Sequence, residues 1–377
     1  MENAGLNRAY RLVWSEVHQA FVAVSELARS GGKGTSKAAV VLATAGLLGS
    51  AALAQNLPSG GQVVAGSGAI AQTGQILTVT QTSDKMAANG QKLSIGQGHT
   101  VNFVQPSSSA VALNRVLGAD VSVIQGALNA NGQVFLVNPN GVLFTPTAQV
   151  NVGALAASTL NLSTDDFMSG NYRFSGSSSA GIHNQGDIRV GTGGSVALIA
   201  ARIENTGSIT APQGSVLMGA GSKVRLDMGG PVKIEVEEGA LNTLIEQGGA
   251  IRADGGLVYL TAKAAGGLAS SVINHTGITE ARSLATGEKG EILLMGDMAH
   301  GSVQVGGTLS ATAPAGAPGG FIETSAHQVK VTEGAQVRAG HWLIDPVDFT
   351  IGAGAGSPTT SGIDGNTGPS ALGRSSV

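Results

Sequence analysis

The stretch GSVALIAARIENTGSITAPQGSVLMGA, residues 194–220, holds one complete repeating unit and the beginning of the next. Apolar residues alternate with small or polar ones, as at Val196 and Leu198, and the same alternation starts again at Val216. A period of two residues predicts short β-strands that bury one face. A glycine precedes each strand, and we expect these glycines to supply the turns.

Two phrases recur on both sides of this stretch. The first phrase is a polar residue, any residue, a glycine and an apolar strand, and its glycines are Gly186, Gly207, Gly249 and Gly277. The second phrase is a glycine followed by a longer alternating run, and its glycines are Gly194, Gly214, Gly256, Gly290 and Gly320. The separations of 21 and 42 residues in the first phrase fit a repeat of about 20 residues, and the separation of 28 between Gly249 and Gly277 needs an insertion.

The length of the repeat decides the fold class. A β-propeller needs about 40 residues per blade and recurrent aromatic residues, whereas this chain has 2 Trp, 3 Tyr and 8 Phe against 58 Gly, with 42% apolar residues. A narrow interior of Val, Ile, Leu and Ala suits that composition. We therefore predict an all-β fold, a right-handed parallel β-helix (solenoid) with an N-terminal cap and small extra-helical hairpins. Coils stacked at about 4.8 Å give a rod on the order of 50–60 Å long.

One segment departs from the repeat, residues 222–239, and we predict that it forms a hairpin that projects from the rod. Its Lys233, Glu235 and Glu237 would share the wet face, with Ile234 and Val236 behind. The carboxylates of Glu235, Glu237 and Glu238 are of the type that binds calcium or catalyses. Strand alternation beside a lysine nevertheless favours a solvated face.

Composition limits the ligands and the chemistry. With a net charge of -3 and few aromatics, the chain offers neither a basic stripe nor a stacking platform, so we expect no nucleic-acid partner. The absence of cysteine excludes disulfides and thiolate metal sites. The acids are scattered and no hydrolase or metallopeptidase motif occurs, so we predict no enzyme, no catalytic residue, no metal and no cofactor.

The N-terminal region has the order of an export signal. An apolar run at residues 38–54 follows Lys33 and Lys37 and ends in the small-x-small site Ala52-Leu53-Ala54. This order predicts cleavage between Ala54 and Gln55. A membrane anchor needs about 20 apolar residues, and Gln55, Asn56 and Pro58 interrupt the run.

The residues before that run carry a first resemblance. The segment YRLVWSEVHQAFVAVSE, residues 10–26, resembles the extended signal peptide region of very large secreted proteins of Gram-negative bacteria, the autotransporters and two-partner-secreted exoproteins. We assign residues 1–54 to this signal.

A turn stands between two apolar strands further along the chain. Asn138-Pro139-Asn140-Gly141 joins residues 134–137 to residues 142–144. Proline presets φ at the second position, asparagine tolerates the third, and the Asn138 side chain can bond its own backbone. On these grounds alone the segment is a β-turn.

The surrounding sequence, however, resembles the two-partner secretion domain of filamentous haemagglutinins and related exoproteins over roughly residues 56–300. Its signature has the form NRV…ANGQVFL.NPNGV.F…VNVG.L.AST, whereas a second motif of some members, NPNL, is missing. The matching residues are Asn114, Arg115, Val116, Asn131, Gly132, Asn138, Pro139, Asn140, Gly141, Asn151, Val152, Gly153, Ser158 and Thr159.

This resemblance implies export. A dedicated outer-membrane β-barrel transporter recognises such a domain through soluble periplasmic domains, and the chain crosses unfolded before it coils outside. The residues implied in recognition are Asn114, Asn138, Pro139, Asn140 and Gly141. The product is an adhesin or haemagglutinin-like exoprotein, secreted or held at the cell surface, with a ligand on a host or neighbouring cell.

Other functions stay open. The segment HWLIDP, residues 341–346, is similar to part of large adhesins and haem-acquisition exoproteins, which adds a haem-carrier-binding exoprotein as an alternative. A delivery stalk of a contact-dependent toxin and a polysaccharide lyase on a β-helix are further alternatives. For the organisation of the chain we predict a secretion domain at 55–300, further coils at 301–350, and a low-complexity linker or truncated end at 351–377.

Overall fold

The computed structural model describes residues 10–15, 20–25, 57–228, 233–267 and 270–347. The chain divides into two units, residues 1–51 and 52–377, and each is described by itself. In the first unit, β1 (Tyr10–Ser15) pairs antiparallel with β2 (Ala20–Ser25). The predicted cleavage residues Ala52, Ala54 and Gln55 and the predicted linker at 351–377 lie outside the described residues.

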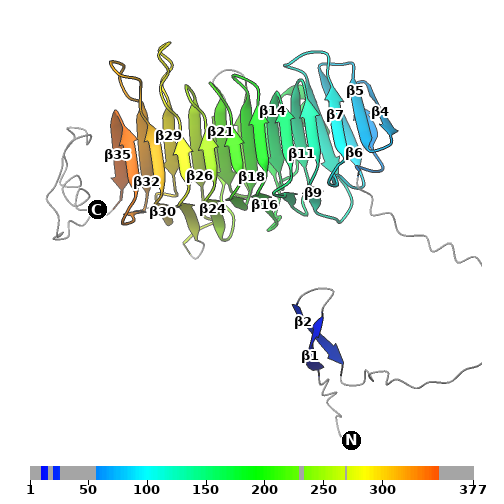
Figure 1. The fold of residues 1–377 in the computed structure, drawn as a ribbon, viewed down its shortest axis with the longest axis horizontal. Helices are drawn as coiled ribbons and strands as arrows, with labels where there is room; N and C mark the ends of the chain where they lie inside the picture. Colours follow the sequence, from blue (N-terminus) through cyan, green and yellow to red (C-terminus); the bar gives the residue numbers. More distant parts are fainter. Residues whose placement is uncertain (1–9, 16–19, 26–56, 229–232, 268–269, 348–377) are drawn as a thin grey trace, which may run out of the picture. The chain divides into compact units, whose positions relative to one another are not determined.

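Three long sheets form the described part of the second unit, and their strands follow one another in sequence order along one axis (Figure 1). Sheet 1 contains β34 (Gln336–Ala339), β31 (Thr308–Ala311), β28 (Ile278–Glu280), β25 (Ala250–Arg252), β20 (Ser208–Thr210), β17 (Asp187–Val190), β13 (Gln149–Val152), β10 (Ala127–Ala130), β7 (Thr100–Val104), β5 (Ile76–Gln81) and β4 (Gly68–Thr73). Sheet 2 contains β3 (Gln62–Ala65), β6 (Lys85–Gly90), β8 (Val111–Val116), β11 (Gln133–Val137), β14 (Ala154–Ser158), β18 (Ser195–Ala200), β21 (Ser215–Ala220), β26 (Leu257–Ala262), β29 (Glu291–Met295), β32 (Phe321–Ala326) and β35 (His341–Pro346). Sheet 3 contains β33 (Gln328–Val331), β30 (Gly301–Val305), β27 (Ser271–His275), β24 (Thr243–Gln247), β19 (Arg202–Asn205), β16 (Gly181–Asn184), β12 (Val142–Phe144) and β9 (Ser122–Ile124).

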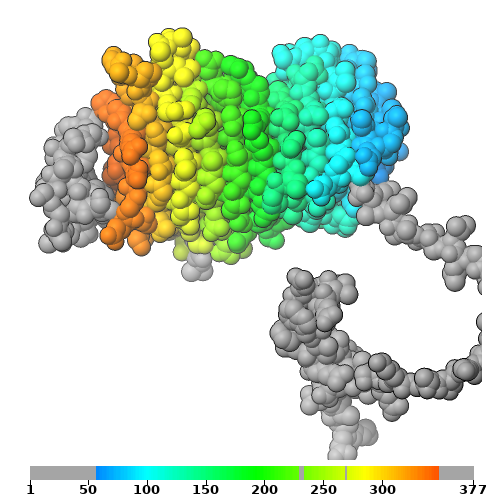
Figure 2. All heavy atoms as spheres, in the orientation of Figure 1, coloured from blue at the N-terminus to red at the C-terminus, as the bar shows by residue number. Residues whose placement is uncertain are grey.

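The pairing within these sheets is parallel from β5 and β6 onward, so the predicted parallel β-helix is confirmed. The cap at its N-terminal end is antiparallel, because β3 pairs with β6 and β4 pairs with β5 in opposite directions. Figure 2 shows the coils lying against each other in sequence order along the rod.

The register of the strands matches the two sequence phrases. In sheet 1, Asp187 pairs with Ser208, which pairs with Ala250. In sheet 2, Ser195 pairs with Ser215, which pairs with Leu257. Because Ser208 pairs directly with Ala250, the separation of 42 residues is a single coil with an insertion between β21 and β24, so the expectation that it fits the plain repeat was wrong. Ala250 pairs in turn with Ile278, so the insertion predicted between Gly249 and Gly277 is confirmed.

The glycines before these strands have a further role besides the one predicted. A Cβ on Gly214 would lie 1.8 Å from the carbonyl oxygen of Gly194, and one on Gly249 would lie 2.2 Å from that of Gly207. None of these four glycines has a positive φ. Glycine is required there because the backbones of successive coils approach too closely for any side chain. The expectation that these glycines supply turns holds for Gly194 and Gly214, whose amides donate to the Gly191 and Ala211 carbonyls over 2.8 and 3.1 Å. It does not hold for Gly207 and Gly249, whose amides donate to carbonyls of the preceding coil.

The interior of the coils is aliphatic with a buried polar ladder. Ile182, Ile203 and Ile245 stack in register and are at most 1% exposed. Beside them the Asn184 amide donates to Asn205 Oδ1, and the Asn205 amide donates to Gln247 Oε1, each over 2.7 Å. Each coil thus satisfies polar groups of its neighbour, as burial requires.

A second layer covers the outer face of sheet 2. It consists of the antiparallel sheet β15 (Tyr172–Ser175), β22 (Lys223–Asp227) and β23 (Lys233–Glu238) together with α1 (Thr164–Ser169). The predicted hairpin is therefore present, but the expectation that it projects was wrong, because Leu226 and Ile234 are each 3% exposed in a second apolar core.

The helix was not predicted, although its sequence carries the signals. Ser163 caps its N-terminus by accepting from the Asp166 amide, and Gly170 ends it in the left-handed conformation at φ 81°. A serine followed three residues later by an acid is a capping pattern, with the acid reaching back to the cap. The helix escaped prediction because six residues show no helical apolar period.

Candidate functional site

The Asn138–Gly141 segment forms the predicted β-turn between β11 and β12. The Gly141 amide donates to the Asn138 carbonyl over 3.1 Å, which closes the turn. Gly141 has φ 116°, a value that favours glycine. The Asn138 amide donates to Ser158 of the following coil over 2.9 Å. The turn therefore sits at the corner between sheets 2 and 3, with its backbone fixed to the next coil.

The Asn138 side chain is completely buried, at 0% exposure. Its Nδ2 donates to the Asp120 carbonyl and to Ser122 Oγ, each over 2.9 Å. Its Oδ1 accepts from the Asn140 backbone amide over 2.9 Å and from Asn140 Nδ2 over 3.1 Å. Two of these four hydrogen bonds join the turn to the preceding coil, the other two lie within the turn, and the side chain touches no solvent.

The two residues at the tip of the turn lie further out. Pro139 is exposed, and its carbonyl accepts from Ser178 Oγ over 2.5 Å. Asn140 is half-buried, and its Nδ2 donates to the Gly118 carbonyl over 2.8 Å. In the folded domain, Pro139 is consequently the residue of the turn most available to a partner.

Asn114 does not join the other predicted site residues. It lies on β8, 8% exposed, and its Nδ2 contacts the carbonyls of Ala112 and Phe135 at 3.3 and 3.4 Å. It lines a cavity near the N-terminal cap, whereas Pro139 and Asn140 line a different one. The structure thus brings Asn138 to Gly141 together and separates Asn114 from them.

Sequence reasoning missed two residues that hold the turn, Ser122 and Ser178. Ser122 pairs with Val142 in the neighbouring strand, so the 20-residue repeat carried a signal for it. Ser178 comes from the connection between β15 and β16, which has no repeat to place it.

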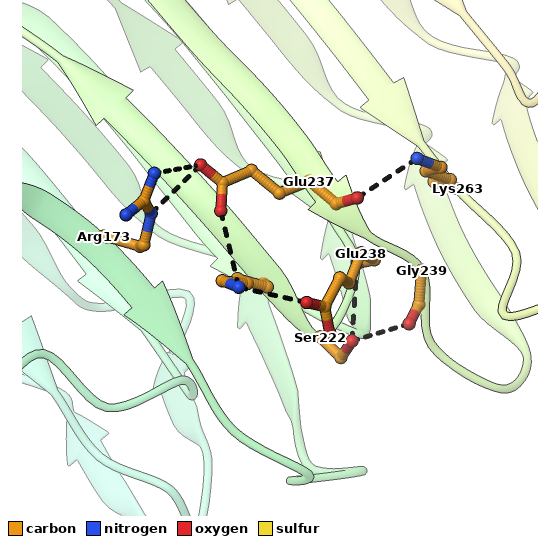
Figure 3. A network of polar contacts seen from close by, with 7 residues as sticks. Arg173, Ser222, Glu237, Glu238, Gly239 and Lys263 are labelled. Atoms are coloured by element: carbon orange, nitrogen blue, oxygen red, sulfur yellow. Dashed lines mark hydrogen bonds and ion pairs between the residues drawn. The ribbon is translucent and has the colours of Figure 1, made fainter.

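Two of the three glutamates singled out on the predicted hairpin, Glu237 and Glu238, are engaged in ion pairs. Glu237 Oε1 lies 2.7 Å from Arg173 Nη2, and Glu238 Oε1 lies 3.0 Å from Lys223 Nζ. Figure 3 shows Arg173 and Lys263 on either side of Glu237, with Lys263 donating to the Glu237 carbonyl over 3.1 Å. These carboxylates therefore neutralise neighbouring cations on a solvated face, as the alternation predicts. The described residues contain no group of three or more His, Asp or Glu that could hold a metal ion.

Asp254 and His275 are two of the titrating groups in the later coils whose pKa values are shifted. Burial raises the pKa of Asp254, but bidentate hydrogen bonds from Arg282, at 3.0 and 2.6 Å, hold it below its ordinary value. Burial lowers the pKa of His275, whose Nδ1 lies 2.7 Å from the Gly306 carbonyl and whose Nε2 lies 2.9 Å from Thr279 Oγ1. His275 is a satisfied neutral residue inside the coils.

A parallel β-helix with an N-terminal cap and an outer cover, preceded by an export signal, defines a class of secreted β-solenoid proteins. Residues 54–311 match the model of the TPS secretion domain, and residues 7–54 match that of the Extended Signal Peptide of Type V secretion system. The chain therefore belongs to the two-partner secretion (TPS) domain family.

Curated relatives and a solved structure agree with this assignment. The chain is 31% identical over 221 residues to a Heme/hemopexin-binding protein of Haemophilus influenzae, covering 56% of this chain and 24% of the relative. A second Heme/hemopexin-binding protein of Haemophilus influenzae is 45% identical over 102 residues, covering 27% of this chain and 11% of the relative. The chain thus spans about a quarter or less of these relatives. The HMW1 secretion domain from Haemophilus influenzae superimposes with a TM-score of 0.51 at 22% identity, covering 76% of this chain and 100% of that one, which shows the fold.

Family membership fixes the route of the protein. The signal directs export across the inner membrane, and the secretion domain directs passage through the outer membrane by a dedicated transporter, so the product is secreted or displayed at the surface. Among the described residues no helix has the length and apolarity to span a bilayer.

Proposed function

We propose that the chain is the N-terminal part of an adhesin-like exoprotein without enzymatic activity. Its secretion domain engages the periplasmic domains of the transporter, and the folded rod then presents a surface to a ligand on a host or neighbouring cell. The secretion-domain match supports the export part of this proposal. The ion pairing of Glu237 and Glu238 supports a non-catalytic face on the hairpin.

Our proposal for the role of the Asn138–Gly141 turn rests on the burial of the Asn138 side chain. Because that side chain is inaccessible once the coil has formed, a transporter meets it only while the chain is unfolded. We assign the turn two successive roles: the unfolded segment is bound in the periplasm, and the emerging segment then locks the coil onto the preceding one through the bonds to Asp120 and Ser122.

The test compares Asn138→Ala with Asn205→Ala. Each substitution removes a fully buried amide with several partners, so each is expected to destabilise the folded domain by about 2–4 kcal/mol. An asparagine exposed in a turn would lose only about 1 kcal/mol on the same substitution. Only Asn138 lies in the signature. Recognition predicts that Asn138→Ala lowers the amount of secreted protein severalfold more than Asn205→Ala at equal loss of stability.

Pro139→Ala is the complementary variant, because Pro139 is exposed and donates no hydrogen bond. It should leave the refolded domain within a few degrees of the wild-type Tm and reduce secretion if the tip of the turn is contacted. Equal secretion of the Asn138 and Asn205 variants, with normal secretion of Pro139→Ala, would assign the turn to folding alone.

A second candidate function is binding of a haem carrier, favoured by the likeness to two Heme/hemopexin-binding proteins. Immobilised exported protein and soluble haem-loaded hemopexin provide the test by biolayer interferometry. Saturable binding would favour this function over adhesion, and its absence would remove the carrier as a ligand of these coils.

A further inference from the structure

The outer cover on sheet 2 ends in an open strand edge. In the cover sheet β22 lies between β15 and β23, so β23 pairs with β22 on one side, and no strand among the described residues pairs with its other side. At one end of that free side, Lys263 Nζ donates to the Glu237 carbonyl over 3.1 Å (Figure 3). A strand edge whose N–H and C=O groups are unpaired is a template for one more strand.

The register of the cover shows which backbone groups are free. Ser175 of β15 exchanges backbone hydrogen bonds of 2.9 Å with Asn161, so its N–H and C=O face away from β22. Backbone groups alternate in direction from residue to residue in antiparallel strands. This alternation, followed through the pairs of β22, directs the N–H and C=O of Ile234 to the free side of β23. The described residues give these two groups no hydrogen-bond partner.

The side chains of β23 leave this edge accessible. The Ile234 side chain is 3% exposed in the core beneath the cover, whereas Lys233 and Glu235 are exposed. Natural sheet edges are often blocked by a charge that points inward or by a bulge. Here both charges lie on the solvent face, and the bulge of β23 lies toward its other end, opposite Lys223 and Val224.

A groove follows the free side of β23. Its volume is 540 Å³, and strands β26 and β29 of sheet 2 form its floor with Leu257, Tyr259 and Leu293. These three side chains are half-buried, and Leu257 and Tyr259 already pack against the core beneath the cover. The apolar outer face of sheet 2 therefore extends beyond the last strand of the cover, and one more strand would bury it.

The charges that line the groove are mainly acidic. Arg225 lies 3.9 Å from Asp227, so these two charges largely neutralise each other. The remaining charged lining residues are Lys233 on one side and the two carboxylates of Glu235 and Glu291 on the other. The net charge of the lining is consequently negative.

A third carboxylate lies on the far side of the floor. Burial raises the pKa of Tyr259, and the charges of Glu323 and Glu235 raise it further, so both carboxylates lie close enough to act on the phenol. Glu235 belongs to β23 and Glu323 to β32, so acids stand on both sides of the apolar floor. An anionic segment would be repelled there and a cationic one attracted.

From these observations we propose that the groove beside β23 binds an extended segment of a partner polypeptide by strand addition, and that this segment alternates apolar and cationic side chains. Its backbone pairs with the free edge at Ile234, its apolar side chains cover Tyr259 and Leu293, and its cations lie beside Glu235. The surface goes beyond the role of the turn in export, because it exists only in the folded protein.

The test uses purified exported protein and three fluorescein-labelled heptapeptides in fluorescence polarisation. The first peptide alternates valine and lysine, the second alternates valine and glutamate, and the third is the first with every backbone nitrogen methylated. We expect a Kd of about 100 µM for the first and binding at least about tenfold weaker for the other two. Hydrogen exchange in β23 should slow when the first peptide is bound.

Each part of the proposal has an outcome that contradicts it. No binding of the first peptide at about 2 mM, or equal binding of the methylated one, would refute strand addition. Equal binding of the glutamate peptide would refute the charge selection. Dimerisation of the protein in light scattering that Leu293→Lys abolishes would assign the surface to a second copy and overturn the proposal.

Two variants and two matched controls locate the binding. Leu293→Lys places a charge on the floor, and Leu244→Lys makes the same change at a half-buried position on the outer face of sheet 3. Glu235→Lys reverses a charge at the edge, and Glu333→Lys does so in the exposed turn after β33.

Leu293→Lys should weaken binding of the first peptide at least about tenfold and Glu235→Lys about 3- to 10-fold, with both controls at wild-type affinity. Circular dichroism of all four variants checks that the fold is kept. Unchanged binding in Leu293→Lys, or equal loss in Leu244→Lys, would place the peptide elsewhere and refute the site. Secretion is not the readout, so the outcome is separate from that of the transporter proposal.

Discussion

The rod has two apolar cores, and different kinds of side chain fill them. Inside the coils, aliphatic residues stack in register, and the ladder from Asn184 to Gln247 runs through them. Under the outer cover, aromatic rings gather: Phe135 contacts Tyr172 at 4.9 Å and Phe167 at 5.9 Å between ring centroids.

The difference follows from geometry. Inside the coils the same position recurs every coil at about 4.8 Å, so residues of one size repeat, and a polar residue is satisfied by its equivalent in the next coil. The cover has no such repeat. Strand β15 and helix α1 of the cover come from one insertion, and strands β22 and β23 come from another. Large aromatic rings fill the irregular space between the cover and sheet 2.

A charge inside the coils should have the largest effect. Leu198 is 0% exposed among aliphatic neighbours, so Leu198→Asp is expected to cost more than about 4 kcal/mol and to prevent cooperative folding. Thr80→Asp, at an exposed position of sheet 1, is the control and should melt normally. Thermal unfolding followed by circular dichroism is the measurement, and a folded Leu198→Asp protein would show that the interior tolerates water.

Truncation under the cover should be nearly as costly but local. Phe135→Ala removes the ring that contacts Phe167, Tyr172 and Phe174, with an expected loss of about 3–5 kcal/mol. Hydrogen exchange should then show lost protection in β15, β22 and β23 while β29 and β32 keep theirs. Uniform loss over all coils would mean that the two cores unfold as one unit.

The polar ladder should show an intermediate effect. Asn205→Ala leaves the Asn184 amide and Gln247 Oε1 without their partners, and we expect a loss of about 2–4 kcal/mol. Chemical denaturation gives the free energy of unfolding. Asn205→Gln, which keeps an amide, is the matched comparison, and equal loss in both variants would show that packing rather than pairing dominates.

The smallest effect is a dependence on pH. Burial lowers the pKa of His275 in the folded protein below its ordinary value of 6.5. The unfolded chain therefore binds a proton first as the pH falls, so His275 stabilises the fold above about pH 6.5 and this contribution is lost toward the lower folded pKa. The free energy of unfolding is therefore expected to fall as the pH is lowered from 7 to 5. His275→Gln should flatten that part of the pH profile, and an unchanged profile would assign the dependence to other groups.

Much of the fold was predictable because its information is local. The alternation around Val196 and Leu198, repeated at Val216, predicted the strands, and the spacing from Gly194 to Gly214 predicted the length of a coil. The separation from Gly207 to Gly249 misled, because an insertion of about one coil length is indistinguishable from a second coil in the spacing alone. The turn at Asn138–Gly141 was predictable from proline and glycine at fixed positions. The close approach of the backbones at the coil-corner glycines was not predictable, because in the sequence a glycine required by such an approach looks the same as a glycine required by a turn.

By itself, the sequence determined the parallel β-helix, the order of its coils, the turn and the export signal, because repetition and short-range pattern encode them. Only the tertiary structure decided which residues of those elements are buried, which are exposed and which lie in contact. It packed the hairpin on sheet 2, buried Asn138 against Asp120 and Ser122, and placed Asn114 away from the turn, at a cavity near the N-terminal cap. The physical reason is that these contacts join residues from different coils and insertions, whose meeting depends on how whole layers pack and not on any periodicity along the chain.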